Sequence, residues 1–476
     1  MHFNWDVFIN LGIISLALLI ATFIRSKVKF FQKFLIPNAL TAGFILLPLY
    51  NYVFPSLGFE IGTLKDLAYH FLGMSFVVLT LKNTKPKSKE NDGAMPMAIG
   101  ILYQYSIQLI VGLLLTFALV KTIKPDLFWS FGEFMPLGFV LGPGQAMSIG
   151  MSWNNMMDMS GLGSVGLTFA AIGFILCCFG GIYFIHFAIR NKWVSKEELA
   201  YMEKGGTRRG IFSRDRKEPK PVGSYLTSES EAIDSMTLQT GLAIFTYFLS
   251  FLFLLGLTNL LALIGDAGVQ LGESLWGINF IFAALTGMVV RKVLVALKAD
   301  HIVDNLTMNR VSGLLVDIMV TAAIAAISIA VVLDYWLPIL IVSLVGGAIS
   351  IWAVIYIGSR MYKTHRFFRT LMIFGVSTGT LSTALALIRV VDPEFESPVV
   401  EDYTYGSGIV FVLVIPLILF MSWPVKAFIS GNWMYFWMFF GLCFIYFIGC
   451  TIYFILKSKN NAFKNKRQVW LKKKAD

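Results

Sequence analysis

The segment FVLGPGQAMS (Phe139–Ser148) combines features that an ordinary membrane-spanning helix avoids. Two glycines flank Pro143, which has no backbone N–H to give to a helix, and the polar residues Gln145 and Ser148 follow in the same run. Inside a bilayer every backbone polar group needs a partner, so such a segment is tolerated only where it is buried in protein or lines a wet cavity. The segment therefore predicts a broken helix at membrane depth.

The chain around this segment has the composition of an integral membrane protein. Of its 476 residues, 57% are apolar and only 14% are charged, whereas soluble domains have about 25% charged residues. Apolar runs of about 20 residues, the length that crosses a hydrocarbon core, recur along almost the whole chain. Hydropathy predicts an all-α protein in the lipid bilayer with eleven spans, near residues 7–24, 34–54, 64–81, 95–120, 163–187, 238–264, 274–294, 310–333, 338–358, 405–425 and 432–456.

The order of these spans predicts two halves related by an inverted repeat. Each half has five spans, with a Gly- and Ser-rich segment between the fourth and the fifth, near 132–160 and 370–392. We expect both segments to be re-entrant. Residues 188–237 hold ten Lys or Arg and eight Asp or Glu, which is typical of a solvated linker. The predicted units are a first repeat at 1–187, the linker, a second repeat at 238–425, and an extra helix with a basic tail at 426–476.

The distribution of cations predicts the orientation in the membrane. If the N-terminus lies outside, only Lys65, Lys121, Lys124 and Lys426 of the 39 Lys and Arg residues fall in outward segments. The positive-inside rule favours this arrangement, with the linker and the C-terminus in the cytosol and the protein in the cytoplasmic membrane. The net charge of +11 then reflects topology, and no nucleic-acid partner is expected.

Broken helices meeting near the midplane are typical of secondary transporters. Their freed carbonyls and hydroxyls bind sodium, and the amides at helix N-termini bind carboxylates. Asp317, inside the eighth span, would cost about 2.5–3.5 kcal/mol to insert, which makes it a candidate for sodium or proton binding. The predicted sodium ligands are Asp317, Gly142 and Ser377. The predicted substrate ligands are Gly142, Gly144, Gln145, Ser148, Ser377, Thr378, Gly379, Thr380, Thr383 and Arg389.

Each of these residues also has a purely structural interpretation. Small residues permit close packing of membrane helices, and Asp317 suits a hydrogen bond between helices or a place in the interface. Arg389 suits a side chain that reaches the bilayer surface. The four cysteines and five histidines show no metal-ligand spacing, and no acid–base constellation is visible, so neither a cofactor nor an enzyme is expected.

Several motifs resemble the glutamate:sodium symporter family. They are IPNALTAG (Ile36–Gly43), LGPGQA (Leu141–Ala146) with LTFAAIGF (Leu167–Phe174), and the stretch Phe374–Ile388. The resemblance covers most of the chain except the linker and the last helix. It implies two inverted five-helix halves, sodium-coupled uptake of glutamate, a homodimer, and an elevator-like movement of a core domain against a scaffold.

The chain departs from the family pattern where substrate is expected to bind. The first loop of these carriers typically reads GGHGT, whereas residues 142–146 read GPGQA. The resemblance therefore implies a glutamate-like carboxylate as substrate. Two alternatives remain open. A sodium/proton antiporter would explain Asp317, but such proteins usually have two adjacent carboxylates in the membrane, and this chain does not show a second one. An ion channel could use the same paired loops, but symmetry about a pore axis would be more natural for it than an inverted repeat.

Overall fold

The computed structural model of the protein describes residues 5–82, 93–195, 198–199, 222–229, 231–263, 265–392, 397–465 and 468–471. All regular secondary structure in these ranges is helical, and eleven helical segments are long and apolar enough to cross a membrane. The prediction of an all-α membrane protein is confirmed, and each predicted span overlaps one of these segments. They are Asp6–Lys27, Asn38–Leu57, Gly62–Leu81, Ala94–Thr122, Leu162–Arg190, Ser235–Ala262, Asn279–Ala296, Asn305–Ala325, Trp336–Met361, Val399–Ser430 and Trp433–Ser458.

The helices of the first half, with the short helical turns that extend them, run as follows: α1 (Asp6–Lys27), α2 (Lys29–Lys33), α3 (Asn38–Pro48), α4 (Gly62–Leu81), α5 (Ala94–Thr122), η3 (Phe131–Glu133), α6 (Phe134–Pro136), η4 (Leu137–Leu141), α7 (Pro143–Met157), α8 (Leu162–Ile175), η5 (Leu176–Gly180) and α9 (Gly181–Arg190). Of the predicted linker, residues 200–221 lie outside the described residues.

The second half continues with α11 (Ser235–Ala262), α12 (Asp266–Gly277), α13 (Asn279–Ala296), η6 (Asp300–Ile302), α14 (Asn305–Ala325), α15 (Ile329–Asp334), α16 (Trp336–Ile341), η7 (Val342–Gly346), α17 (Gly347–Met361), α18 (Arg366–Thr378), α19 (Leu381–Val391), α20 (Val399–Leu419), α21 (Trp423–Ser430) and α22 (Trp433–Ser458). The eighth span ends eight residues earlier than predicted, at Ala325, because a turn at Ala326–Ser328 interrupts an apolar run that continues into α15.

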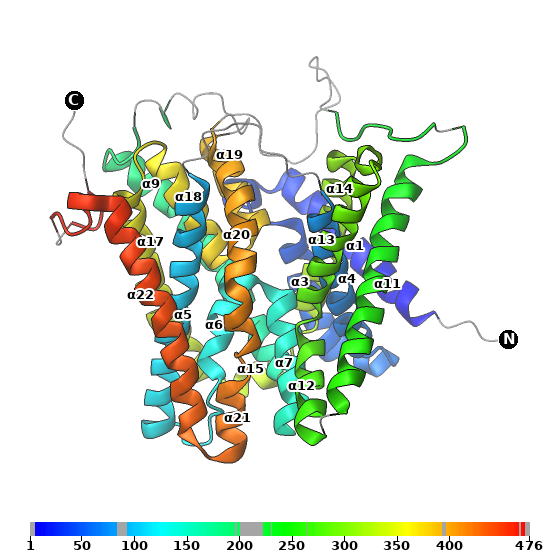
Figure 1. Cartoon of the computed structure of the whole chain (residues 1–476), viewed down its shortest axis with the longest axis horizontal. Helices are drawn as coiled ribbons and strands as arrows, with labels where there is room; N and C mark the ends of the chain where they lie inside the picture. The colour runs from blue at the N-terminus through cyan, green and yellow to red at the C-terminus, as the bar shows by residue number, and fades with distance from the viewer. Residues whose placement is uncertain are drawn as a thin grey trace.

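The helices form two groups in Figure 1. In one group α4 packs against α13 and α14, and α14 also packs against α3. In the other group α5 packs against α20 and α22. Helix α7 lies between the two groups in this view and packs against α8, whereas α6 packs against α5 and α18 packs against α17 and α5 within the second group.

Glycines allow the closest of these helix contacts. A Cβ atom on Gly150 of α7 would lie 2.8 Å from the Cα atom of Gly163 in α8, and one on Gly166 would lie 2.6 Å from the carbonyl oxygen of Ala146. The pattern GLGSVG (Gly161–Gly166) is thus explained by helix packing, in keeping with the absence of any described strand before it. Backbones in contact here hold α7, and the break before it, at a fixed depth.

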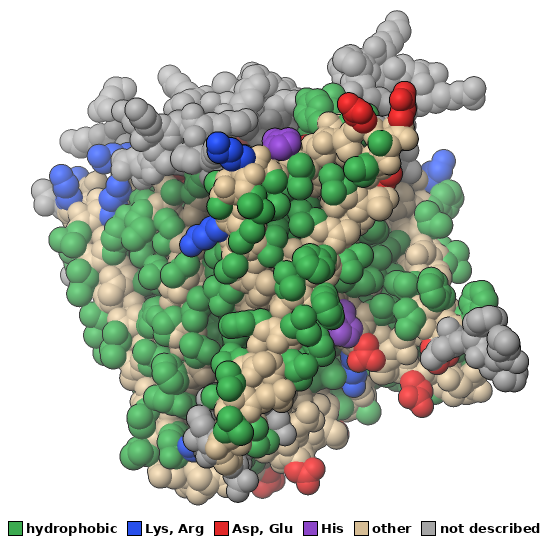
Figure 2. Space-filling view, turned by 45° about the vertical axis from the view of Figure 1, so that its right-hand side comes forward, with side chains coloured by type: hydrophobic (Ala, Val, Ile, Leu, Met, Phe, Trp, Pro, Cys, Tyr) green, Lys and Arg blue, Asp and Glu red, His purple; other side chains and the backbone are tan. Residues whose placement is uncertain are grey.

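The surface of the protein suits a bilayer. Figure 2 shows hydrophobic side chains over most of the face in view, with charged side chains few and mostly toward its edges. Large apolar residues are exposed along α1, α11 and α22, among them Leu19, Phe245 and Ile445. Since exposed apolar side chains on this scale are unfavourable in water, these helices face lipid or another protein in the membrane.

Candidate functional site

The first predicted interruption is a break between two helices. The helical segment that begins at Phe131 ends at Leu141, and α7 begins at Pro143. Gly142, between them, has φ 100° and ψ 179°, a conformation open almost only to glycine. Its N–H still donates to the Leu137 carbonyl oxygen (2.8 Å), and its own carbonyl oxygen accepts from the Ala146 N–H (3.1 Å). The chain therefore changes direction at Gly142 alone, and the hydrogen bonds at the end of the first helix and at the start of α7 are kept.

The second predicted interruption has the same character. Helix α18 ends at Thr378, and α19 begins at Leu381 after the two residues Gly379 and Thr380. The Thr383 hydroxyl oxygen accepts from the Thr380 N–H (2.9 Å), and the Thr383 hydroxyl donates to the Thr380 carbonyl oxygen (2.8 Å). Thr383 therefore caps the N-terminus of α19 and stabilises the backbone conformation of the break.

The two breaks, 238 residues apart at Gly142 and Thr380, meet in space. A Cβ atom on Gly142 would lie 2.8 Å from the Thr380 Cγ2 atom, which leaves no room for a side chain. The Gln145 Oε1 atom would lie 3.7 Å from the same Cβ atom of residue 142, and Gln145 is almost fully buried. The sequence predicted both interruptions, and the structure adds that they are in contact.

The remaining predicted substrate residues divide into two sets. Ser377 and Thr378 end α18 beside the break and are buried, and the Gln108 side-chain amide of α5 donates to the Ser377 carbonyl oxygen (2.9 Å). Gly144 and Ser148 are instead engaged in packing. Gly144 abuts Met319 of α14, and the Ser148 hydroxyl donates to the Gly277 carbonyl oxygen at the end of α12 (2.6 Å).

Helix α18 is anchored at its beginning, which fixes the position of the second break. Glu198 accepts from the N–H groups of Phe367 and Phe368 (3.0 and 3.1 Å), where a helix N-terminus favours a negative charge. Arg369 forms a buried ion pair with Asp402 of α20 (2.7 Å). The first turn of α18 is thus tied both to the chain that follows α9 and to α20.

Asp317 and Arg389, predicted separately, line one cavity of about 270 Å³. Asp317 comes from α14 and Arg389 from α19, and both residues are exposed. Arg25 of α1 and Asn38, the first residue of α3, line it as well. The polar lining thus carries two guanidinium groups, one carboxylate, one amide side chain and the start of a helix.

The cavity walls are held by hydrogen bonds that the sequence does not reveal. Arg25 donates through Nη1 to the Ile36 carbonyl oxygen (2.6 Å), and the Asn38 amide donates to the Thr22 hydroxyl oxygen (2.9 Å). The Asn38 Oδ1 atom is buried without a partner among the described residues. These bonds join α1 to the start of α3 and place Arg25 at the cavity.

Helix α14, which carries Asp317, is locked against α3. The Thr321 hydroxyl lies within hydrogen-bond distance of the carbonyl oxygens of Asp317 (2.8 Å) and Ala39 (3.2 Å). A Cβ atom on Gly43 would lie 2.6 Å from Ile324 Cβ. Gly43, the last residue of the IPNALTAG motif, is therefore a point at which α3 and α14 pack closely, and this packing helps to fix the position of Asp317.

Helices α8 and α19 link the cavity to the second break. Phe174 of α8 lines the cavity, and the preceding residue, Gly173, packs directly against the Thr378 carbonyl oxygen. The described lining of the cavity includes neither Gly142 nor Ser377, the two other predicted sodium ligands. The three predicted sodium ligands are therefore not in one place. Asp317 lines the cavity, whereas Gly142 and Ser377 lie at the two helix breaks.

Arg25, Asn38, Gln108 and Glu133 were not predicted as functional residues. Asn38 stands in the quoted motif, and Gln108 and Glu133 are polar residues in or beside apolar spans, so the signal was present for these three. Arg25 looked like one of the interfacial cations that follow the first span. Within the described residues, no group of three or more His, Cys, Asp or Glu side chains is placed to hold a metal ion.

No protein-family model, curated protein or solved structure matches this chain. The resemblance to the glutamate:sodium symporter family therefore stays a prediction from the sequence motifs alone.

Proposed function

We propose that the protein is a secondary active transporter that takes up glutamate or a related small carboxylate with sodium, by an elevator-like alternating-access mechanism. The observation that carries this proposal is the contact between the two helix breaks at Gly142 and Thr380. A helix that ends there presents carbonyl oxygens, and one that begins there presents N–H groups, so the meeting point suits a cation and an anion together.

The adjacent cavity supports a substrate with carboxylate groups. Arg25 and Arg389 provide two planar guanidinium groups, each suited to bidentate pairing with a carboxylate. The start of α3 at Asn38 adds the positive end of a helix dipole. A dicarboxylate would match both arginines, and Asp317 would hold the coupling sodium ion near it. Glutamate fits this pattern of charges.

The rest of the proposal follows the resemblance. The interrupted helices with α8 form the moving core, and a homodimer in the cytoplasmic membrane provides the scaffold. The N-terminus lies outside and the C-terminus in the cytosol. Helices α1 and α11 offer exposed apolar faces for lipid or for the second copy.

Uptake into proteoliposomes tests the function. An inward sodium gradient should drive accumulation of labelled glutamate, and replacement of sodium by potassium should abolish it. Accumulation driven by a pH gradient in potassium would contradict sodium coupling, and flux that never exceeds equilibrium would indicate a channel. Unlabelled glutamate, glutarate and 2-oxoglutarate should be compared as competitors, because they differ at the amino position. Failure of all three to compete would exclude the proposed substrate class.

Arginine variants test the cavity. Arg25→Lys and Arg389→Lys keep the charge but lose bidentate geometry, so we expect each to weaken glutamate affinity about tenfold while leaving the sodium requirement unchanged. The control is Arg291→Lys, which alters an arginine paired with Asp300 away from the cavity (3.7 Å). Wild-type affinity in both cavity variants would remove the cavity from the transport path.

A further inference from the structure

A buried carboxylate that the proposed sodium and substrate sites do not use lies at the start of the first interrupted helix. Glu133 ends η3 and is fully buried. Neither of its carboxylate oxygens has a hydrogen-bond partner among the described residues. Its N–H is bonded to the Ser130 carbonyl oxygen (3.0 Å), so the backbone is satisfied and only the side chain is not.

The backbone contact between η3 and α5 keeps this carboxyl group inside. Gly132 packs directly on Gly112 of α5, and a Cβ atom on Gly132 would also lie 2.6 Å from the Thr116 hydroxyl oxygen. Because the two backbones touch, η3 has no room to turn Glu133 outward. An ionised carboxylate held in such a place without a cation would cost several kcal/mol.

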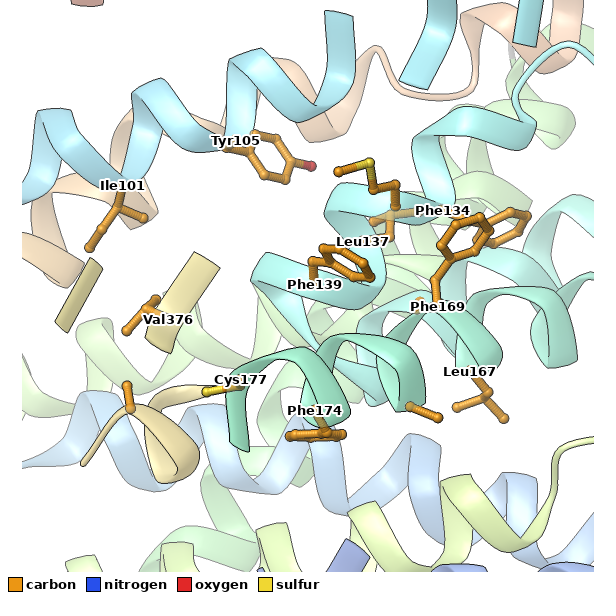
Figure 3. Packing of buried hydrophobic residues seen from close by; sticks show 14 of the residues in the cluster. Ile101, Tyr105, Phe134, Leu137, Phe139, Leu167, Phe169, Phe174, Cys177 and Val376 are labelled. Atoms are coloured by element: carbon orange, nitrogen blue, oxygen red, sulfur yellow. The ribbon is translucent and has the colours of Figure 1, made fainter. Parts of the chain in front are cut away.

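Among the described residues, the groups around Glu133 supply hydroxyls and a thiol but no cation. Tyr105 of α5 and Cys443 of α22 are the titratable side chains that interact electrostatically with Glu133, and the residues of α6 carry none. In Figure 3 the Tyr105 hydroxyl points from α5 toward the helical segment that carries Phe134 and Leu137. The Tyr105 and Ser130 hydroxyls are both buried and lack partners within the described part of the chain.

The polar groups continue along α5 to the second helix break. Gln108 lies three residues after Tyr105 and therefore on the same side of α5, and it is bonded to the Ser377 carbonyl oxygen (2.9 Å). The Gln108 Oε1 and Ser377 Oγ atoms are again buried without partners among the described residues. Each unsatisfied buried polar group costs about 1–3 kcal/mol, so a row of them indicates groups that water or an exchangeable proton satisfies.

We propose that Glu133 is a proton-binding site of this protein, connected through bound water along Tyr105 and Gln108 to the break at Ser377. A hydronium ion of the bulk water gives its proton to the carboxylate, so that one O–H bond of the hydronium ion breaks, one O–H bond forms on Glu133, and water and a neutral carboxylic acid remain. The neutral acid donates a hydrogen bond to the bound water between it and the Tyr105 hydroxyl, and it is stable in its apolar surroundings. Glu133 itself is not one of the proposed sodium or substrate ligands, although the path from it ends at Ser377, which is one of them; protonation of Glu133 can therefore be tested without a transport assay.

Infrared difference spectroscopy tests the proposal without any transport assay. The full-length wild-type protein, reconstituted in lipid near neutral pH, should show the carbonyl-stretch band of a protonated carboxylic acid, and the band should shift in heavy water. Glu133→Gln should remove this band. Glu60→Gln, which changes an exposed carboxylate, should leave it in place. A band that survives in Glu133→Gln, or the lack of any band in the wild type, would overturn the proposal.

Two further measurements complete the test. Tyr105→Phe removes the hydroxyl beside the acid, so the band should move to higher frequency as its hydrogen bond weakens. Ser377→Ala should change the exchange rate of the band in heavy water, since it acts at the far end of the path. Loss of the band on addition of sodium alone would show that the site takes a cation instead. Glu133→Gln should keep the wild-type melting temperature because it replaces one neutral group with another.

Discussion

Asp317 is the side chain on which the proposed sodium coupling depends most. It is the carboxylate of the cavity lining, and its helix is held in place by Thr321 and by the packing of Gly43 on Ile324. Because a carboxylate attracts a cation more strongly than neutral oxygens do, Asp317→Asn should raise the sodium concentration for half-maximal uptake by about tenfold or more. Uptake measured over a matrix of sodium and glutamate concentrations gives this value.

The matched control for Asp317→Asn is Asp300→Asn. It makes the same chemical change at a residue whose carboxylate faces Arg291 outside the cavity. Sodium dependence should stay at the wild-type value in the control. If Asp317→Asn also keeps it, then the residue has a structural role, and the sodium ligands must be sought at the helix breaks. If the variant instead loses its preference for glutamate over glutarate, Asp317 pairs with the substrate's ammonium group.

Ser377 and Ser148 should respond in opposite ways to the loss of a hydroxyl. The Ser377 hydroxyl makes no hydrogen bond within the described structure, whereas the Ser148 hydroxyl joins α7 to α12 through the Gly277 carbonyl oxygen. We expect Ser377→Ala to reduce uptake while leaving the melting temperature unchanged. Ser148→Ala should lower the free energy of unfolding by about 1 kcal/mol. If the two variants changed uptake and unfolding free energy to the same extent, the assignment of Ser377 to transport and Ser148 to packing would be wrong.

The sequence allowed the prediction of some site residues and not of others, for physical reasons. Asp317 stands out because a carboxylate in an apolar run is costly, and Gly142 stands out beside Pro143. Arg25 does not stand out, because a cation at the end of a first span is expected at any membrane interface. Only the folded arrangement of α1, α14 and α19 brings it to the same cavity as Asp317 and Arg389.

At the scale of the helix, the break at Gly142 should tolerate no side chain. Its φ of 100° strains any other residue, and a Cβ atom would be 2.8 Å from Thr380. Gly142→Ala should therefore cost about 1–3 kcal/mol of stability and abolish uptake. Gly449→Ala, within α22 and with no atom within 4 Å of the added Cβ, should be neutral or stabilising. Melting temperatures and uptake rates of the two variants provide the comparison.

The start of α14 has a cap that should make its stability sensitive to acid. Burial alone would raise the pKa of Asp304, but hydrogen bonds from Thr307, Tyr225 and Leu306 outweigh it and hold the pKa below its usual value. The stabilisation is therefore present above the unfolded pKa of about 3.9 and is lost as the pH falls through the lower folded pKa.

Asp304→Ala removes the cap and should lower the free energy of unfolding by about 0.5–2 kcal/mol near neutral pH. The difference from the wild type should shrink in strongly acidic buffer, where Asp304 is protonated in both states. Thermal unfolding over a pH series measures this difference. A difference that stays constant below the unfolded pKa would show that the carboxylate charge contributes nothing.

The interruptions of the helices were predictable, whereas their contact was not. Glycine and proline act locally, so residues 139–148 and 374–383 indicate breaks without reference to the rest of the chain. The approach of Gly142 to Thr380 depends on how α7, α8 and α18 pack. Hydropathy also failed to find the end of α14 at Ala325, because the turn that follows remains apolar.

At the scale of the whole molecule, the eleventh helix and the residues after it join parts that are far apart in the sequence. Trp433 at the start of α22 stacks on Trp129, near the first interrupted helix (3.6 Å between ring centroids). After α22, Trp470 stacks on Trp193 (5.1 Å between ring centroids). Arg360, at the end of α17, donates to the carbonyl oxygens of Lys464, Asn465, Gln468 and Val469. These contacts explain how α22 and the residues after it become part of the fold.

The orientation of the whole protein gives the last prediction, which follows from the cation distribution. All four cysteines, Cys177, Cys178, Cys443 and Cys450, are buried, so an impermeant maleimide should meet little native background in intact cells. Ser228→Cys places a thiol in the segment before α11 and should resist labelling until the membrane is opened. Asp126→Cys, on the exposed turn after α5, should react at once from outside. Labelling of Ser228→Cys alone in intact cells would reverse the orientation. If the thiols at positions 126 and 228 both reacted from outside, an even number of spans would lie between them, and this would contradict the odd number that the inverted repeat requires.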